Sequence, residues 1–150
     1  MMDELRELYQ QIILDHNKNP KNFYAIENPT HFSEGYNPLC GDRINVYMKI
    51  EDNVIKDISF QGSGCAISKA SASVMTSELK GKKVDEAQKL FDIFHKLITG
   101  EIDPGDIYQY GKLAVFAGVR EFPVRVKCAA LAWHTMLAAL KKEKSVVSTE

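Results

Sequence analysis

The 150-residue chain has little cysteine, almost no net charge and no long apolar run. Its three cysteines cannot all pair with one another within the chain, so disulfides alone do not account for them. No segment approaches the roughly 18 consecutive apolar residues that a membrane-spanning helix needs. A formal net charge of -1 gives no indication of a general nucleic-acid binder. From these three features we expect a globular protein that has no membrane or nucleic-acid partner.

Length and composition indicate a single domain over residues 1–150, because a chain of this size can bury a sizeable core. The first residues, Met1 to Glu4, lack the basic region and the apolar run of a secretory signal, so we expect a cytoplasmic protein. Thiols stay reduced in that compartment, and the cysteines are therefore expected to be metal-binding or reactive. The polar residues 143–150 are expected to fray.

Cys40 and Asp42 place a thiol and a carboxylate on either side of Gly41, which lets the backbone bend so that both face one point. Two further cysteines would complete a set of three thiolates and one carboxylate. Zn²⁺ accepts sulfur and oxygen donors of this kind, and thiolates also bind iron or a [2Fe–2S] cluster. The alternative is that the cysteines are buried as small hydrophobic side chains. The working hypothesis is one metal ion bound by Cys40, Asp42, Cys65 and Cys128.

Hydrophobic periodicity predicts three strands and five helical segments. Apolar and polar residues alternate over residues 43–50, and a second strand returns over 54–60 after a turn. An edge strand is expected near residues 31–36. The predicted class is α+β, with a small antiparallel three-stranded sheet packed against about five helices and the metal site at one end of the sheet. Helical spacing is found at residues 3–16, 65–80, 84–98, 113–119 and 124–142.

The predicted hairpin gives two of the ligands a geometric reason to meet. Its outgoing strand begins just after Asp42, and its return strand ends just before Cys65. Antiparallel pairing therefore brings Cys40 and Cys65 to the same end of the sheet. Cys65 also begins a helix, where the helix dipole favours a thiolate. Cys128 lies in the first turns of the last helix, close to the positive charge of Arg125.

None of the four histidines is placed near a cysteine by these patterns. His16 ends the first helix and is expected to be a polar cap or a surface group. His31 and His95 are expected at the surface, and His134 is expected to be partly buried. A cysteine hydrolase that uses Cys40 with one of these histidines as its base therefore lacks support in the sequence.

Three short motifs resemble the cysteine motifs of the IscU/NifU-like iron–sulfur cluster assembly proteins. They are NPLCGD at residues 37–42, GSGCAIS at residues 62–68 and RVKCA at residues 125–129. The segment from residue 9 to residue 19 also resembles the first helix of that family. The resemblance extends from about residue 3 to residue 142. It implies the fold of that family and a role in iron–sulfur cluster assembly.

In two features this chain departs from the IscU-type scaffolds and resembles the SufU branch of the family. Scaffolds of the IscU type usually carry a histidine just before the third cysteine, whereas this chain has Lys127. The chain also has an additional segment around residues 100–120. The resemblance to SufU implies tight zinc binding and acceptance of sulfur from a cysteine desulfurase, with downstream iron–sulfur assembly or acceptor proteins as further partners. The alternative is a scaffold on which a [2Fe–2S] cluster is built and transferred.

Persulfide transfer is the expected chemistry, with Cys40 as the acceptor of the outer sulfur. Cys40 is chosen because it follows a loop with Gly35 and Pro38 and adjoins the flexible Gly41, whereas the other two cysteines lie at helix starts. Arg125 is expected to help hold the open site. On this hypothesis the protein is a sulfur carrier rather than an enzyme with a small-molecule turnover of its own. A purely structural zinc module is a further alternative.

Overall fold

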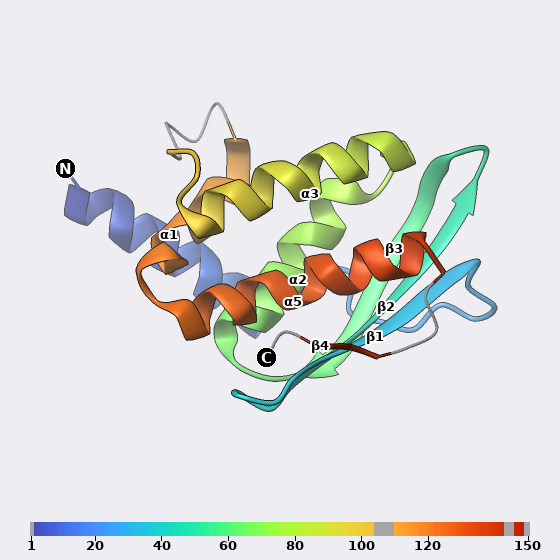
Figure 1. Cartoon of the computed structure of the whole chain (residues 1–150), viewed down its shortest axis with the longest axis horizontal. Coiled ribbons are helices and arrows are strands. Elements are labelled where there is room, and N and C mark those ends of the chain that lie inside the picture. Colours follow the sequence, from blue (N-terminus) through green and yellow to red (C-terminus); the bar gives the residue numbers. More distant parts are fainter. Residues whose placement is uncertain (1, 104–109, 143–145, 149–150) are drawn as a thin grey trace.

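The computed structural model describes residues 2–103, 110–142 and 146–148 (Figure 1). Four α-helices, one 3₁₀ helix and four strands are defined within them. No helix in these ranges is long and apolar enough to cross a membrane. In chain order the elements are α1 (Met2–Lys18), β1 (His31–Asn37), β2 (Asp42–Glu51), β3 (Val54–Ser63), α2 (Ala66–Leu79), α3 (Val84–Thr99), η1 (Gly111–Glu121), α5 (Pro123–Leu140) and β4 (Val147–Ser148).

The strands form one mixed sheet in the order β3-β2-β1-β4. β2 pairs antiparallel with β1 and with β3, and β4 pairs parallel with β1. The alternation predicted for residues 43–50 is present in β2, where Ile44, Val46 and Met48 are buried and the residues between them are partly exposed. Figure 1 shows the helices gathered on one side of the sheet. The predicted α+β class is therefore confirmed.

A fourth strand corrects the expected three-stranded sheet, and it lies within the segment that was expected to fray. Val147 and Ser148 pair with β1. Without β4 the outer edge of β1 would present unpaired main-chain groups. Two returning residues cover part of that edge through main-chain pairing, which needs no apolar pattern in the sequence. The strand expected at the edge near residues 31–36 therefore lies inside the sheet as β1. Residues 143–145 and 149–150 lie outside the described part of the chain.

The central element is α5, as its apolar composition predicts. The Trp133 ring stacks on Phe94 of α3 with 4.6 Å between ring centroids, and Phe94 meets Phe116 of η1 edge-on at 5.7 Å. The short helical segment predicted at residues 113–119 is present as η1, a 3₁₀ helix. One side of α5 therefore packs on this aromatic cluster, and another side packs on β1 and β2.

The contact between β1 and α5 depends on Gly35. A Cβ atom at this position would overlap the Thr135 hydroxyl oxygen and would lie 3.0 Å from Leu131 Cδ1. Asn37 lies two residues farther along the same buried face of β1, and Cys128 lies about one turn before Leu131 on α5. The close approach at Gly35 thus sets the spacing between the end of β1 and the start of α5.

Replacing Gly35 with alanine is expected to destabilise the protein by about 1–3 kcal/mol, because the added methyl group overpacks the contact between β1 and α5. Gly118→Ala is the matched control, since a Cβ atom there meets nothing within 4 Å. Urea unfolding followed by circular dichroism measures the free energy of unfolding of both variants. Equal stability of the two variants would contradict this account of the packing.

Candidate metal centre

Two connections carry predicted ligands to one end of the sheet. The hairpin of β1 and β2 closes with Asn37 paired to Asp42, so Cys40 lies in its four-residue loop. Gly41 has a φ of +70°, a left-handed conformation that glycine adopts without strain. At the same end β3 finishes and the chain enters α2, with Cys65 as the N-cap residue. The antiparallel geometry expected from the sequence therefore brings these cysteines to one end of the sheet.

The first turns of α5 place Cys128 beside this end of the sheet. Its Sγ lies 3.2 Å from Cys40 Sγ. The ligand atoms of Cys40, Asp42 and Cys128 all lie within 4.8 Å of one another. Cys65 joins the cluster through Asp42, because its Sγ lies 3.8 Å from Asp42 Oδ2. The structure thus brings together all four side chains that the sequence hypothesis selected.

N–H groups hold three of these side chains in place. The Cys65 N–H donates to Asp42 Oδ1 at 2.7 Å, and the Ser68 N–H donates to Cys65 Sγ at 3.4 Å. The side-chain amide of Asn37 donates to Asp42 Oδ2 at 3.4 Å and to Cys128 Sγ at 3.5 Å. Hydrogen bonds of this kind fix the orientation of metal ligands before a metal binds.

Gly64 allows the main chain to pass directly against the Asp42 carboxylate. A Cβ atom at this position would overlap Asp42 Oδ1 and would lie 2.9 Å from Cγ. Any side chain at this position would therefore displace the carboxylate or the loop that leads to Cys65. This contact gives a physical role to the glycine just before the second cysteine.

The four side chains differ in burial. Asp42 is 0% exposed and Cys128 is 2% exposed, whereas Cys65 is half-buried and Cys40 is exposed. Burial raises the pKa of the Cys128 thiol, and the hydrogen bonds with Cys40 and Cys65 raise it further. Among the described residues no lysine or arginine forms an ion pair with the buried Asp42 carboxylate. Three thiols and this carboxylate fit a cation that takes both sulfur and oxygen ligands, such as Zn²⁺.

Arg125 is not among the side chains that meet at the cluster. Its guanidinium lies 4.4 Å from the centroid of the Phe122 ring, at the exposed start of α5. Within the described ranges, no hydrogen bond or ion pair joins Arg125 to any of the four predicted ligands. The predicted role of Arg125 in holding the open site therefore has no contact to support it.

His16 is buried, so its expected position as a cap or surface group is wrong. The side chain is 6% exposed, and Nδ1 lies 2.7 Å from Ser73 Oγ of α2, a partner 57 residues away. His95 is half-buried instead of exposed, because its ring meets Phe91 and His134. His134 is partly buried, as expected. In the part of the chain that the structure describes, no histidine is hydrogen-bonded to a cysteine, so the hydrolase alternative gains no support.

Asn37 is a residue of the site that the sequence analysis did not single out. It belongs to the NPLCGD motif, but an asparagine before a proline is ordinary turn chemistry and indicates no partner. Its contacts depend on the hairpin loop that pairs it with Asp42 and on the packing of β1 against α5. Recognising residues 38–41 as a hairpin connection would have placed it beside the carboxylate.

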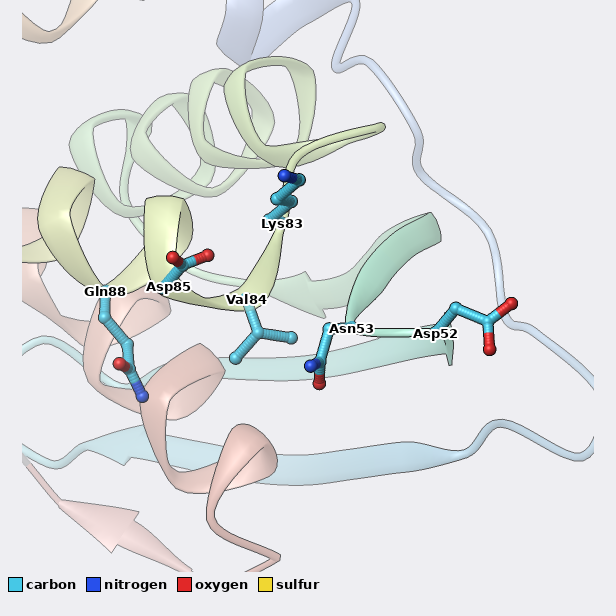
Figure 2. Close-up of a pocket in the computed structure, with 6 residues that line it drawn as sticks. All are labelled: Asp52, Asn53, Lys83, Val84, Asp85 and Gln88. Atoms are coloured by element: carbon cyan, nitrogen blue, oxygen red, sulfur yellow. The ribbon is translucent and has the colours of Figure 1, made fainter.

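A separate pocket lies at the opposite end of the sheet, between the turn of β2 and β3 and the start of α3 (Figure 2). Asp42 begins the ten-residue strand β2, and the pocket lies beyond the other end of that strand. Its lining contains no cysteine or histidine, so it offers no thiol or imidazole ligand for a metal. The lining residues are Asp52, Asn53, Lys83, Val84, Asp85 and Gln88.

Known proteins are similar to this sequence over most of its length. The NifU-like N-terminal domain family matches residues 8–129. The zinc-dependent sulfurtransferase SufU of Bacillus subtilis (strain 168) is 39% identical over 140 residues, which are 93% of this chain and 94% of that protein. The iron–sulfur cluster assembly scaffold protein IscU of Streptococcus pyogenes serotype M1 is 37% identical over 141 residues, which are 94% of this chain and 87% of that protein.

A crystal structure shares the fold. It is that of a candidate iron–sulfur cluster assembly scaffold protein for the SUF system from Fervidobacterium islandicum AW-1, with a TM-score of 0.81 and 35% identity. The match covers 89% of this chain and 97% of that one. The chain therefore belongs to the NifU-like N-terminal domain family, and the resemblance stated from its three cysteine motifs is confirmed.

Burial of His16 makes the stability of the fold depend on pH. Burial has the largest effect and lowers the pKa of His16, Lys112 and Lys21 lower it further, and Asp15 raises it. In the unfolded chain the histidine has an ordinary pKa of about 6.5. Below that pH the unfolded state binds more protons than the folded state, so the free energy of unfolding falls as the pH falls.

Replacing His16 with asparagine is expected to flatten this pH dependence, because asparagine keeps a polar partner for Ser73 and does not titrate. One proton changes the free energy of unfolding by at most about 1.4 kcal/mol per pH unit. Urea unfolding of the reduced, metal-free protein at about pH 7 and about pH 5.5 measures the change. Burial also lowers the pKa of His31 and His134, which leave a residual slope in both proteins. An equally steep loss in the variant would contradict the role given to His16.

Proposed function

We propose that the protein accepts sulfur from the persulfide of a cysteine desulfurase on Cys40 and carries it into iron–sulfur cluster assembly. The observation that carries this proposal is a cluster of three thiols and one carboxylate in which Cys40 alone is exposed. Membership of the NifU-like family supports the role in cluster assembly. The proposed ion is Zn²⁺, and the proposed ligands are Cys40, Asp42, Cys65 and Cys128.

The donor set supports zinc. Thiolates are soft ligands that select zinc or iron over magnesium and calcium. Zn²⁺ bound here would keep the thiols deprotonated near neutral pH and protect them from oxidation. The Bacillus subtilis relative is named as zinc-dependent, which agrees with this assignment.

Cys40 is the thiol that a partner can reach. It lies in the hairpin loop and is exposed. Among the described residues its thiol receives no N–H hydrogen bond, whereas Cys65 receives one from Ser68 and Cys128 receives one from Asn37. Cys40 can therefore turn outward with less loss of contact than the other two cysteines.

The transfer step is an exchange between a thiolate and a persulfide. The Cys40 thiolate attacks the outer sulfur of the desulfurase persulfide, and a new S–S bond forms as the old S–S bond breaks. The electron pair of the broken bond leaves on the desulfurase cysteine, which becomes a thiolate, and Cys40 then carries the persulfide. Sulfur moves without net oxidation, so no further oxidant or reductant is required.

Exposed apolar side chains beside Cys40 and at the start of the helix that carries Cys128 support a protein partner. Leu39, next to Cys40, is 57% exposed, and Phe122 and Val124 at the start of α5 are 45% and 48% exposed. An exposed apolar side chain next to a reactive thiol suits contact with another protein. The proposed partners are the desulfurase and, after sulfur uptake, iron–sulfur assembly or acceptor proteins of the cytoplasm. In this role the chain is a carrier whose turnover depends on both partners.

Incubation with a desulfurase and cysteine is expected to place the persulfide on Cys40. Mass spectrometry of alkylated peptides locates the added sulfur. Cys40→Ser is expected to abolish sulfur uptake, because the only exposed thiol of the cluster is then lost. Sulfur found mainly on Cys65 or Cys128 would refute the choice of Cys40.

A scaffold that assembles a [2Fe–2S] cluster on the same four side chains is the second candidate. Relatives from Streptococcus pyogenes and Thermotoga maritima are named as IscU scaffold proteins and are 37% and 39% identical to this chain. Thiolates bind such clusters, so the donor set suits this role too. The half-buried Lys127 stands before the third cysteine, where the resemblance to scaffolds leads one to expect a histidine.

Metal content separates the two candidates. The purified protein is expected to contain zinc, and Asp42→Ala is expected to bind it at least about 10-fold more weakly, because one of four ligands is lost. Asp52→Ala, in the exposed turn between β2 and β3, is the matched control and should bind zinc normally. Anaerobic reconstitution with iron and sulfide provides the opposing test. A stable, transferable [2Fe–2S] cluster formed in preference to zinc binding would favour the scaffold.

A further inference from the structure

We propose that Asn37 is a positioning residue that keeps Asp42 and Cys128 fixed while Cys40 turns toward a partner's persulfide. This inference deepens the proposed function and rests on it. The observation behind it is that one buried amide is hydrogen-bonded to two of the four proposed ligands at once.

The Asn37 side chain uses its nitrogen twice and its oxygen once. Nδ2 donates to Asp42 Oδ2 at 3.4 Å and to Cys128 Sγ at 3.5 Å, and Oδ1 accepts the Leu39 N–H at 3.2 Å. The residue is 0% exposed, so bulk water cannot replace any of these partners. Asn37 therefore connects the loop that carries Cys40 to both buried ligands.

The chemistry of the neighbours fixes the orientation of this amide. With nitrogen and oxygen exchanged, the carbonyl oxygen would face the Asp42 carboxylate, and the NH₂ group would face the Leu39 N–H. An acceptor would then oppose an acceptor, and a donor would oppose a donor. The observed orientation gives each polar atom of the Asn37 side chain a partner.

The position of Asn37 is fixed by both of its neighbouring elements. It ends β1 in a pair with Asp42 of β2. Two residues earlier, Gly35 brings the same face of β1 into close contact with Leu131 and Thr135 of α5. The amide is therefore held by the sheet and by the helix and does not follow an outward turn of the loop.

The hydrogen bonds from Asn37 gain strength when their acceptors are ionised. With a zinc ion bound, the proposed site would hold three thiolates and one carboxylate as four charges close together, and hydrogen bonds to charged acceptors are about twice as strong as those between neutral groups. Asn37 supplies a neutral donor to two of these charges inside a buried site, where such bonds are strengthened. Asp42 and Cys128 therefore each keep a donor when Cys40 turns away.

Two substitutions separate hydrogen bonding from packing. Asn37→Asp keeps the shape of the side chain and the acceptor for Leu39, but it replaces the NH₂ group with an oxygen that faces Asp42. Asn37→Ser is smaller and keeps one uncharged donor. We expect zinc affinity to decrease from wild type to Asn37→Ser to Asn37→Asp, with a total loss of about 10–100-fold. A role in packing alone predicts the reverse order of the two variants, because serine leaves a gap and aspartate does not.

Two measurements apply to these variants. Competition with a chelating dye at about pH 8 gives the zinc affinity, and the absorption spectrum of the Co²⁺-substituted protein reports the arrangement of the ligands. The intense d–d bands of tetrahedral Co²⁺ are expected to weaken or shift in Asn37→Asp. Asn53→Asp makes the same substitution at an exposed position in the far turn (Figure 2) and is expected to leave both measurements unchanged. Circular dichroism of the metal-free proteins checks that each variant is folded.

Unchanged zinc affinity and an unchanged Co²⁺ spectrum in both Asn37 variants would overturn the inference. A larger loss in Asn37→Ser than in Asn37→Asp would also overturn it. If Asn37→Asp fails to fold, Asn37→Ser is compared with Asn37→Ala, which leaves a gap of similar size and has no donor. Tighter zinc binding by the serine variant supports the inference, and equal binding by the two variants contradicts it. Failure of the wild-type protein to take up sulfur on Cys40 would refute the proposed function instead, because the metal measurements do not involve the desulfurase.

Discussion

The Asp42 carboxyl group is fully buried, and N–H and thiol donors surround its oxygens. The Cys65 N–H and the Asn37 amide donate to its two oxygens, and Gly64 leaves room for the main chain to pass against it. Burying an ionised carboxylate costs several kcal/mol unless an opposite charge shares the site. The described residues supply no lysine or arginine for this purpose, and three thiols stand around the carboxylate instead. A thiophilic cation would therefore satisfy both the carboxylate and the thiols.

The rigid and the reachable parts of this cluster come from different elements. Cys128 lies on α5, which is fixed in the core by the stack of Trp133 on Phe94, and Cys65 caps α2. Cys40 lies on a hairpin loop and is exposed. Relatives named for sulfur transfer and relatives named for cluster scaffolding both resemble this chain, and the donor set alone suits both activities. The exposure of Cys40 beside the buried Asp42 and Cys128 side chains is what favours sulfur transfer here.

Hydrophobic periodicity accounts for most of the fold that could be predicted. The alternation over residues 43–50 predicts the hairpin and with it the meeting of the first two cysteines, because antiparallel pairing decides which residues share an end. The same reasoning could not predict β4, whose two residues pair through main-chain groups without any apolar pattern. It also missed the burial of His16, because the partner Ser73 lies 57 residues away. Asn37 escaped notice for a similar reason, since its partners meet only when the hairpin is packed on α5.

X-ray absorption at the zinc edge of the purified protein tests the central claim most directly, because it counts the atoms bound to the ion. The account predicts a four-coordinate ion with three sulfur atoms at about 2.3 Å and one oxygen atom at about 2.0–2.2 Å. Fewer than three sulfur atoms, or a set of nitrogen and oxygen atoms alone, would contradict it, because the four side chains would then not share one ion.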